Sequence, residues 1–423
     1  MSDPADGRGR GRGGEPDDGP AGTTSIVPGI RRVPPPGPLP ASEPRLVERL
    51  QAEIAASGPI TFARFMAVAL HDPELGYYAA PGPRPGRAGD FVTAPELHPI
   101  FGWTIARTVE EAWGLAGRPA PFTLVEHGAG SGTLGVAILD GLRRSGSPLL
   151  AALRYEPVET APPRRAELEG AIAAAGFAGS LAAPDAAPVA GVVLANELLD
   201  ALPFHRVTSA AGRLRELLVD WDGAAGRFVD AVADPTTPAL AARLEAEGIE
   251  LADGQRAEIC LELDPWLASV AGRLERGVVL LVDYGHDAAE LYGPARREGT
   301  LRTYLRQMVG RDPYAHVGRQ DVTAHVDLTA VVRAGEAAGL RHLGTTTQAA
   351  FLVGSGLGEL LAAIREDPAT TLPSWIELRA AVARLLDPGA TGGFRVVAFG
   401  RALPGDATLA GLGRTRPDLA TAP

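Results

Sequence analysis

Lysine is absent from the 423-residue sequence, whose 40 basic residues are all arginine. This absence excludes a catalytic lysine, a Schiff base and a nucleotide-binding P-loop, because each of them requires a lysine side chain. Cysteine is almost absent as well, and the single Cys260 excludes a disulfide scaffold and a thiolate metal cluster. The net charge of −11 argues against a general nucleic-acid binder, which would carry a basic stripe. No apolar run approaches the roughly 18 residues of a membrane-spanning helix.

Two common catalytic motifs are also missing. The eight histidines form no His-Glu-x-x-His zinc motif. No Gly-x-Ser-x-Gly nucleophile elbow occurs either. The sequence therefore gives no indication of a metal site.

Both ends of the chain have a composition that does not favour a packed structure. Residues 1–40 contain nine glycines and nine prolines, with few large apolar side chains to offset the entropy of ordering. We therefore predict a disordered tail over residues 1–43 and a flexible tail over residues 404–423.

A helical cap region is expected over residues 44–120. Leu46 and Leu50 recur at helical spacing, and Thr61 can cap the helix that follows. Together with a Gly/Pro-rich loop before Asp90, these helices are expected to cover the ligand cleft of the core.

From residue 122 onward, short apolar strands alternate with helices. Strands are predicted at 122–126, 153–156, 192–195 and 277–283. Continuous apolar strands that alternate with helices are typical of a mostly parallel sheet covered on both faces. We therefore predict an α/β core over residues 121–403, with insertions near 204–262 and 287–325.

A glycine-rich turn follows the first of these strands. Glu126 ends the strand, and Gly128, Gly130, Gly132 and Gly135 follow before and within the next helix. Glycine permits positive φ and a close approach of the backbone to a ligand, and a helix N-terminus stabilises negative charge. Because Gly130-x-Gly132-x-x-Gly135 also fits the dinucleotide fingerprint, the turn alone suits a nicotinamide cofactor as well as S-adenosylmethionine.

Glu156 ends the second strand, 30 residues after Glu126. A carboxylate at this position can accept hydrogen bonds from both ribose hydroxyls of an adenosine ligand. The acid before the glycines favours S-adenosylmethionine, whose ammonium group Glu126 can meet. The carboxylate of the same ligand can meet backbone N–H groups of the loop, and the ligand has no pyrophosphate to place at the helix.

Polar side chains also follow two later strands. Asn196, Glu197 and Asp200 come after the apolar strand at 192–195, and Asp283 ends another. Ligands of open α/β sheets bind at the carboxyl ends of the strands. A helix cap needs one such residue, so three in succession favour a functional site.

The chain resembles the family of MidA and the mitochondrial complex I assembly factor 7 arginine methyltransferase. This family is a branch of the class I S-adenosylmethionine-dependent methyltransferases, and the resemblance extends from residue 58 to about residue 400. The matching blocks are residues 58–66, 72–78, 89–96, the glycine loop after Glu126, and residues 195–203, 283–286 and 321–327.

The resemblance implies a Rossmann-like class I methyltransferase fold with a mostly parallel seven-stranded sheet. A reversed hairpin near 340–346 and 394–400 would end that sheet. The implied cofactor is S-adenosyl-L-methionine, and the residues expected to bind it are Thr93, Glu126, Gly128, Gly130, Gly132, Glu156 and Asn196.

The resemblance also implies a protein acceptor, with methyl transfer to an arginine. A guanidinium stays protonated in water, so carboxylates must orient it and stabilise its charge. Glu197 and Asp200 are the candidate catalytic residues, and Glu96 and Asp283 are assigned to substrate binding.

Two other functions stay open on the sequence alone. One is an NAD(P)-dependent Rossmann oxidoreductase that uses the same glycines, and the other is an S-adenosylmethionine-binding assembly factor without turnover. Family members in mitochondria act on a respiratory complex I subunit, so a respiratory complex subunit is a candidate acceptor. The N-terminal tail has no apolar signal core, and its Asp and Glu residues argue against a mitochondrial presequence. Together with the strong Ala/Arg/Gly bias of the chain, this favours a bacterial cytoplasmic location. The sequence does not indicate an oligomeric state.

Overall fold

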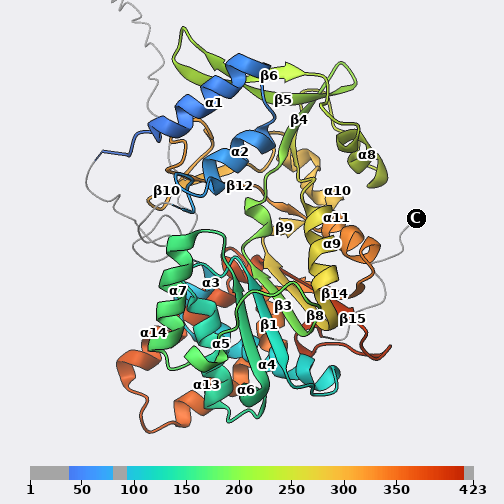
Figure 1. Ribbon diagram of the computed structural model, residues 1–423. Helices are drawn as coiled ribbons and strands as arrows, with labels where there is room; N and C mark the ends of the chain where they lie inside the picture. The colour runs from blue at the N-terminus through green and yellow to red at the C-terminus, as the bar shows by residue number, and fades with distance from the viewer. Residues whose placement is uncertain (1–37, 80–92, 414–423) are drawn as a thin grey trace, which may run out of the picture.

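The computed structural model describes residues 38–79 and 93–413. The lower half in Figure 1 is built on a large sheet, and the upper half combines the N-terminal helices with smaller sheets. The loop expected before Asp90 lies outside the described residues.

The large sheet has six strands in the order β14-β15-β8-β3-β1-β2. Strands β2, β1, β3 and β8 are parallel to one another, and β15 is antiparallel to both β8 and β14. The reversed hairpin expected at the end of the sheet is therefore confirmed. The strands are β1 Phe122–His127, β2 Leu153–Val158, β3 Val189–Asn196, β8 Leu274–Asp283, β14 Arg341–Thr347 and β15 Arg395–Arg401.

The expected seventh strand is not formed by the described residues. Beyond the edge strand β2, Leu181 makes only an isolated parallel bridge with Tyr155. The N–H of Ala182 donates to the Tyr155 carbonyl at 2.8 Å. Pro184 and Pro188 follow, and a proline has no N–H to continue a ladder. The prediction of seven strands is corrected to six for this reason.

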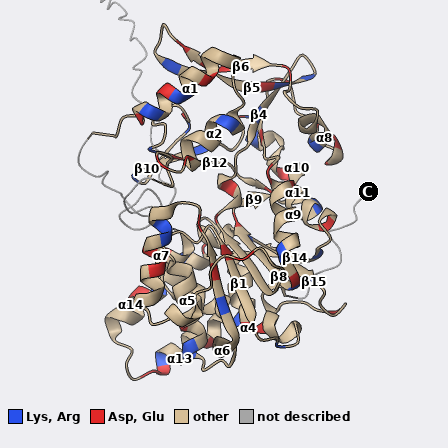
Figure 2. Cartoon of the chain, viewed as in Figure 1, with Lys and Arg blue, Asp and Glu red and all other residues tan. Residues whose placement is uncertain are grey.

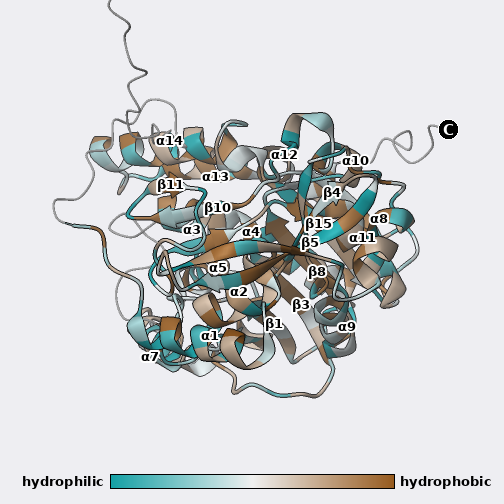
Figure 3. Ribbon diagram, turned by 90° about the horizontal axis from the view of Figure 1, so that it is seen from above, coloured by the Kyte–Doolittle hydropathy of each residue, from teal (hydrophilic) through white to brown (hydrophobic). Residues whose placement is uncertain are grey.

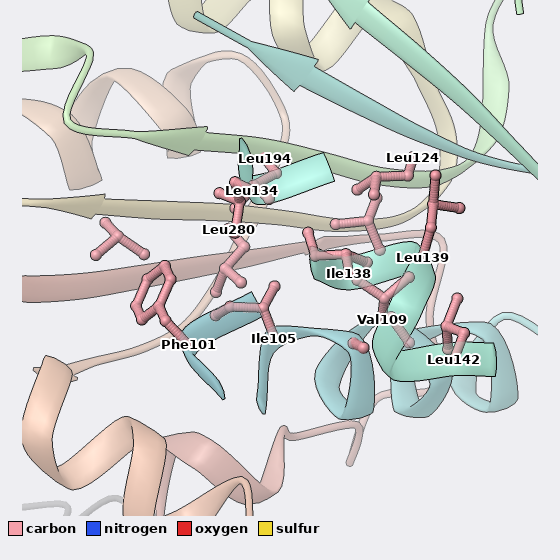
Figure 4. Close-up of a cluster of buried hydrophobic side chains, with 14 of the residues drawn as sticks. Phe101, Ile105, Val109, Leu124, Leu134, Ile138, Leu139, Leu142, Leu194 and Leu280 are labelled. Atoms are coloured by element: carbon pink, nitrogen blue, oxygen red, sulfur yellow. The ribbon is translucent and has the colours of Figure 1, made fainter. Parts of the chain in front are cut away.

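Helices cover both faces of the large sheet, whose strands are strongly hydrophobic (Figure 3). On one face, α4 and α5 pack against β1, β3 and β8 (Figure 4). On the other face, α9 and α11 pack against the same strands. The helices of this half are α4 Ile100–Leu115, α5 Thr133–Arg144, α6 Leu149–Ala152, α7 Pro162–Ala174, α9 Leu263–Arg273, α11 Leu328–Ala337, α12 Gln348–Gly354, α13 Leu357–Glu366 and α14 Leu372–Leu386.

The upper half contains α1 (Pro44–Ser57) and α2 (Phe62–His71), packed on an antiparallel sheet of order β6-β5-β4-β7. Thr61 is the N-cap of α2 as predicted, because its hydroxyl accepts the Arg64 N–H at 3.1 Å. A three-stranded sheet, β11-β10-β12, and the parallel pair β9 and β13 complete this half. Its other elements are β4 His205–Ala210, β5 Arg213–Asp222, β6 Arg227–Ala233, α8 Ala239–Ala246, β7 Arg256–Ile259, β9 Gly285–His286, α10 Ala288–Leu291, β10 Arg302–Leu305, β11 Met308–Gly310, β12 Asp321–Thr323 and β13 Val326–Asp327.

Two segments pack with a different part of the fold from the one to which the expected domain boundaries assign them. Helix α4, grouped with the cap region, packs on the large sheet. Residues 404–413 are not part of a flexible tail, because Leu409 and Leu412 are buried in the same hydrophobic cluster. The Ala410 N–H also donates to Glu111 at 2.9 Å.

Charged residues of both signs are mixed on the exposed helices, as Figure 2 shows for α1 and α7. Within the described part of the chain, no helix is both long and apolar enough to cross a membrane.

Candidate functional site

The glycine-rich turn joins β1 to α5. Gly128, Gly130 and Gly132 have φ values of 69°, 53° and 81°, a left-handed conformation that glycine adopts without strain. A Cβ atom on Gly128 would lie 3.0 Å from the Leu198 side chain, and one on Gly132 would lie 3.0 Å from the Leu168 side chain. The turn therefore needs glycine both for its conformation and for its close packing. The N–H groups of Gly128, Gly130 and Gly132 already donate to the Val158 carbonyl, Glu159 Oε2 and the Ala129 carbonyl. The groups that can meet a ligand carboxylate are therefore the N–H groups in the first turn of α5.

Glu126 lies near the carboxyl end of β1 with its side chain buried. Its Oε2 accepts a hydrogen bond of 2.8 Å from the Tyr155 hydroxyl. Burial raises the pKa of Glu126 to about 7, and the Tyr155 hydrogen bond acts in the opposite direction. Because a buried carboxylate is stabilised by a cation, this position suits a ligand ammonium group.

Two carboxylates on β2 and just after it have different surroundings. Glu156 lies inside the strand, is 4% exposed, and binds Arg273 of α9 through Oε2 at 2.6 Å. Glu159 follows the last residue of β2, and its Oε2 accepts the Gly130 N–H at 3.1 Å. The structure therefore places Glu159, which the sequence analysis did not assign, against the glycine turn.

Glu197 follows β3 in a left-handed conformation, with φ of 52°. Its N–H donates to the Val282 carbonyl at 2.8 Å, which holds this backbone in place. Its Oε1 accepts the Ala94 N–H and the Asn196 side-chain amide, both at 3.2 Å. Burial, with the charge of Asp200, raises the pKa of Glu197 to about 8. Strained backbone of this kind is concentrated at functional sites.

Asp283 holds the backbone that follows Glu197. Its Oδ2 accepts the N–H groups of Leu198, Leu199 and Asp200 at 3.1, 2.8 and 3.3 Å. Burial, followed by the charge of Glu197, raises the pKa of Asp283 to about 7. This carboxylate fixes the short helix η2 (Leu199–Ala201), whereas the sequence analysis assigned it to the substrate.

Asp200 is 7% exposed and lies beside Asp283 at the end of the sheet. One of its oxygens, Oδ2, accepts a hydrogen bond from the Tyr284 hydroxyl. The other, Oδ1, is buried and has no partner among the described residues. Burial and the neighbouring charge of Asp283 raise the pKa of Asp200 well above its ordinary value.

Helix α3 (Ala94–Leu97) connects the glycine turn with these carboxylates. Glu96 accepts a hydrogen bond of 3.0 Å from the Thr133 hydroxyl at the start of α5. Ala94, the first residue of α3, donates its N–H to Glu197. The buried Thr93 immediately precedes this helix. The structure thus brings Thr93 and Glu96 to the edge where the other predicted residues lie.

Three tyrosines complete the site, although the sequence analysis gave them no role. Tyr155 binds Glu126, Tyr284 binds Asp200, and the Tyr78 hydroxyl donates to Asp321 at 2.8 Å. Tyr284 and Tyr78 lie within the matching blocks, but only the fold shows which carboxylates they contact.

The chain matches known proteins over most of its length. A family model for S-adenosyl-L-methionine-dependent methyltransferases matches residues 104–346. This chain belongs to that family. The protein arginine methyltransferase NDUFAF7 homolog of Drosophila melanogaster, a mitochondrial protein, is 31% identical over 73% of this chain and 74% of its own length. The mitochondrial NDUFAF7 protein arginine methyltransferase of Mus musculus is 28% identical over 74% of each chain.

A solved structure of a related protein has the same fold as this chain. The crystal structure of a Burkholderia thailandensis protein bound to S-adenosyl-homocysteine is 34% identical, with a TM-score of 0.80. The similarity covers 89% of this chain and 98% of that one. The chain is an S-adenosyl-L-methionine-dependent methyltransferase, which decides against the nicotinamide alternative.

Proposed function

We propose that this methyltransferase transfers a methyl group to an arginine side chain of a protein. The observation that carries the proposal is a pair of carboxylates after β3: Asp200, which is buried, and Glu197, which is half-buried and is followed by Leu198, whose side chain lies against Gly128 of the glycine turn. Such carboxylates favour a cationic acceptor. The printed names of the NDUFAF7 relatives, which are protein arginine methyltransferases, support the same acceptor class.

On the cofactor side, the residues present fit S-adenosyl-L-methionine. We assign its ammonium group to Glu126, because the cation would compensate the burial of that carboxylate. The turn of Gly128, Gly130 and Gly132 would leave room for the ligand, and the N–H groups in the first turn of α5 would meet its amino-acid carboxylate. Thr93 and Asn196 are proposed to line the same edge.

We assign the ribose hydroxyls to Glu159 in place of Glu156. Ligands of parallel sheets bind beyond the carboxyl ends of the strands, and Glu159 follows the last residue of β2. Glu156 is paired with Arg273 inside the fold, so we propose a structural role for it.

On the acceptor side, we propose that Glu197 and Asp200 are the catalytic residues. Oε1 of Glu197 accepts two N–H groups, which orients the carboxylate toward the acceptor. Oδ1 of Asp200 has no partner among the described residues and can accept a guanidinium N–H. Glu96 lies at the margin of this site, and Asp283 supports it by holding the η2 backbone.

Bound S-adenosyl-L-methionine supplies a methyl group that its sulfonium has already activated. The chain must hold the acceptor nitrogen in line with that methyl group and exclude water. The bound group would give its methyl carbon to the acceptor nitrogen and leave as a thioether that keeps the electron pair of the broken carbon–sulfur bond. The guanidinium proton passes to the ionised carboxylate of Glu197 or Asp200, whose raised pKa values suit this step.

Radiolabel transfer from S-adenosyl-L-methionine into proteins of cells that lack this enzyme tests the proposal. We expect label in methylarginine after hydrolysis, and the Glu197→Gln variant should lose it while retaining cofactor affinity. Label in other residues only, or unchanged labelling by the variant, would contradict the assignment. Subunits of respiratory complexes are the first acceptors to identify by mass spectrometry.

A further inference from the structure

The three-stranded sheet β11-β10-β12 presents one polar face. Tyr304 of β10 lies directly opposite Asp321 of β12, so their side chains share a face. Thr323 is two residues further along the same strand and shares that face, because successive side chains alternate. Arg302 of β10 lies directly opposite Thr323 on this face. Val322 points the other way, into the hydrophobic cluster of the upper half.

This polar face lies beside the proposed acceptor site. The Ala324 N–H donates to the backbone carbonyl of Asp200 at 3.1 Å, which joins the end of β12 to η2. The charge of Asp321 contributes to the raised pKa of Asp200. The charges of Asp200 and Asp321 both contribute to the raised pKa of Tyr304. The small sheet therefore lies next to residues 197–201, which carry the proposed catalytic carboxylates and are called the catalytic loop below.

Of the polar atoms in this region that are buried without a partner among the described residues, one belongs to β12 and one to η2. They are Oγ1 of Thr323, whose residue is 2% exposed, and Oδ1 of Asp200, whose residue is 7% exposed. Buried polar atoms are nearly always hydrogen-bonded, so each exception requires an explanation. A ligand that donates hydrogen bonds to both atoms would satisfy them.

A guanidinium group has the required chemistry. It carries one positive charge and five N–H donors in a plane, so it can bind several acceptors on opposite sides at once. An ammonium group offers three donors from a single point and spans a smaller distance. A guanidinium between the two segments would meet one carboxylate from the catalytic loop, Asp200, and a second from the small sheet, Asp321.

We propose that Thr323 and Asp321 bind the guanidinium of the acceptor from the small sheet and thereby select arginine. The proposal rests on the proposed function and adds residues of the 321–327 block to the acceptor site. Thr323 accepts a guanidinium N–H through its hydroxyl, and Asp321 balances the charge while Tyr78 holds its carboxylate.

Thr323→Val tests this role, because valine keeps the shape of threonine and removes the hydroxyl. The assay is label transfer from S-adenosyl-L-methionine into an extract of cells lacking the enzyme, at a series of extract concentrations. We expect an apparent KM for extract about tenfold higher, which is the effect of losing one hydrogen bond to a charged group. Cofactor affinity, measured by titration calorimetry, should stay unchanged, and Thr323→Ser should restore the KM.

Thr303→Val is the matched control. Thr303 is buried in the same small sheet but pairs with Val322, so its side chain lies on the opposite face. This variant should show the KM of the unmodified protein. If Thr323→Val does not fold, Asp321→Asn replaces it, because an asparagine oxygen can still accept the Tyr78 hydrogen bond.

The outcomes separate this inference from the proposed function. If the unmodified protein produces no methylarginine, the proposed function fails whatever the variants do. If it produces methylarginine and Thr323→Val or Asp321→Asn has an unchanged KM, the assignment of the small sheet is overturned. A higher KM in these variants, with a normal KM for Thr323→Ser and Thr303→Val, supports it.

Discussion

The hydroxyl of Tyr155 lies 2.8 Å from Oε2 of Glu126, so the second strand fixes the acid that ends the first. Gly135 makes this contact possible, because a Cβ atom there would lie 2.3 Å from the Tyr155 oxygen. The last glycine of the fingerprint thus leaves room for a hydrogen bond that orients the proposed ammonium ligand. Helix α5, strand β2 and the cofactor site are joined at this one point.

Cofactor binding should depend on the ionisation of Glu126. Its pKa of about 7 means that only the ionised fraction can pair with an ammonium group. The affinity for S-adenosyl-L-methionine should rise roughly eightfold between pH 6 and pH 7.5 if that fraction alone binds. Glu126→Gln should bind at least tenfold more weakly and lose this pH dependence. Titration calorimetry over this pH range measures both effects, and a pH-dependent Glu126→Gln variant would disprove the assignment.

Gly135→Ala should destabilise the fold. The new methyl group would overlap the Tyr155 ring and hydroxyl, and overpacking of this kind typically costs about 1–3 kcal/mol. Gly114→Ala is the control, because Gly114 lies in helix α4 with no atom within 4 Å of an added Cβ. That variant should be more stable by about 0.5–1 kcal/mol. Chemical denaturation compares the two, and equal stabilities would contradict the packing argument.

Glu159 and Glu156 should have opposite effects when each is changed to glutamine. Glu159→Gln should weaken cofactor binding about tenfold with little loss of stability, since a hydrogen bond to a charged group is removed. Glu156→Gln should lower the free energy of unfolding by about 3 kcal/mol, because Arg273 would remain buried without its carboxylate. Calorimetry and denaturation of both variants distinguish the roles, and the reverse pattern would restore Glu156 as the ribose ligand.

Methyl transfer should accelerate as the pH rises toward 8. Glu197 has a pKa raised to about 8 by burial, and its ionised form is the one that binds the guanidinium and accepts a proton. The value of kcat/KM should therefore increase through pH 7 and level off above pH 8. Initial rates at saturating cofactor remove the contribution of Glu126. A rate that falls over this interval would exclude Glu197 as the proton acceptor.

The sequence predicted β1, β3 and β8 because each contains a largely apolar run that is followed by a polar residue near its carboxyl end. It also predicted a site at Glu126, the glycine turn and Glu197, and the structure places these residues at the carboxyl ends of β1 and β3. It did not distinguish Glu156 from Glu159, because strand ends are uncertain by a few residues. That difference decides whether the carboxylate faces Arg273 or the turn.

Other features could not be predicted from the sequence, because they depend on contacts that exist only in the folded protein. Asp283 accepts hydrogen bonds from three backbone N–H groups, and these bonds form only when η2 is folded. The contact between Tyr78 and Asp321 joins residues 243 positions apart. The resemblance to the family implied a seventh strand, whereas Pro184 and Pro188 interrupt the ladder beyond β2 in the described residues.

The route of the chain between the two halves has a mechanical consequence. The four-stranded sheet of the upper half is inserted between β3 and β8. These are the strands that end at Asn196 and Asp283, next to the proposed catalytic carboxylates. The chain leaves the large sheet after Asn196 to form the four-stranded sheet, and again after Asp283 to form β9 and the small sheet, so the backbone beside both carboxylates is restrained by both halves of the molecule.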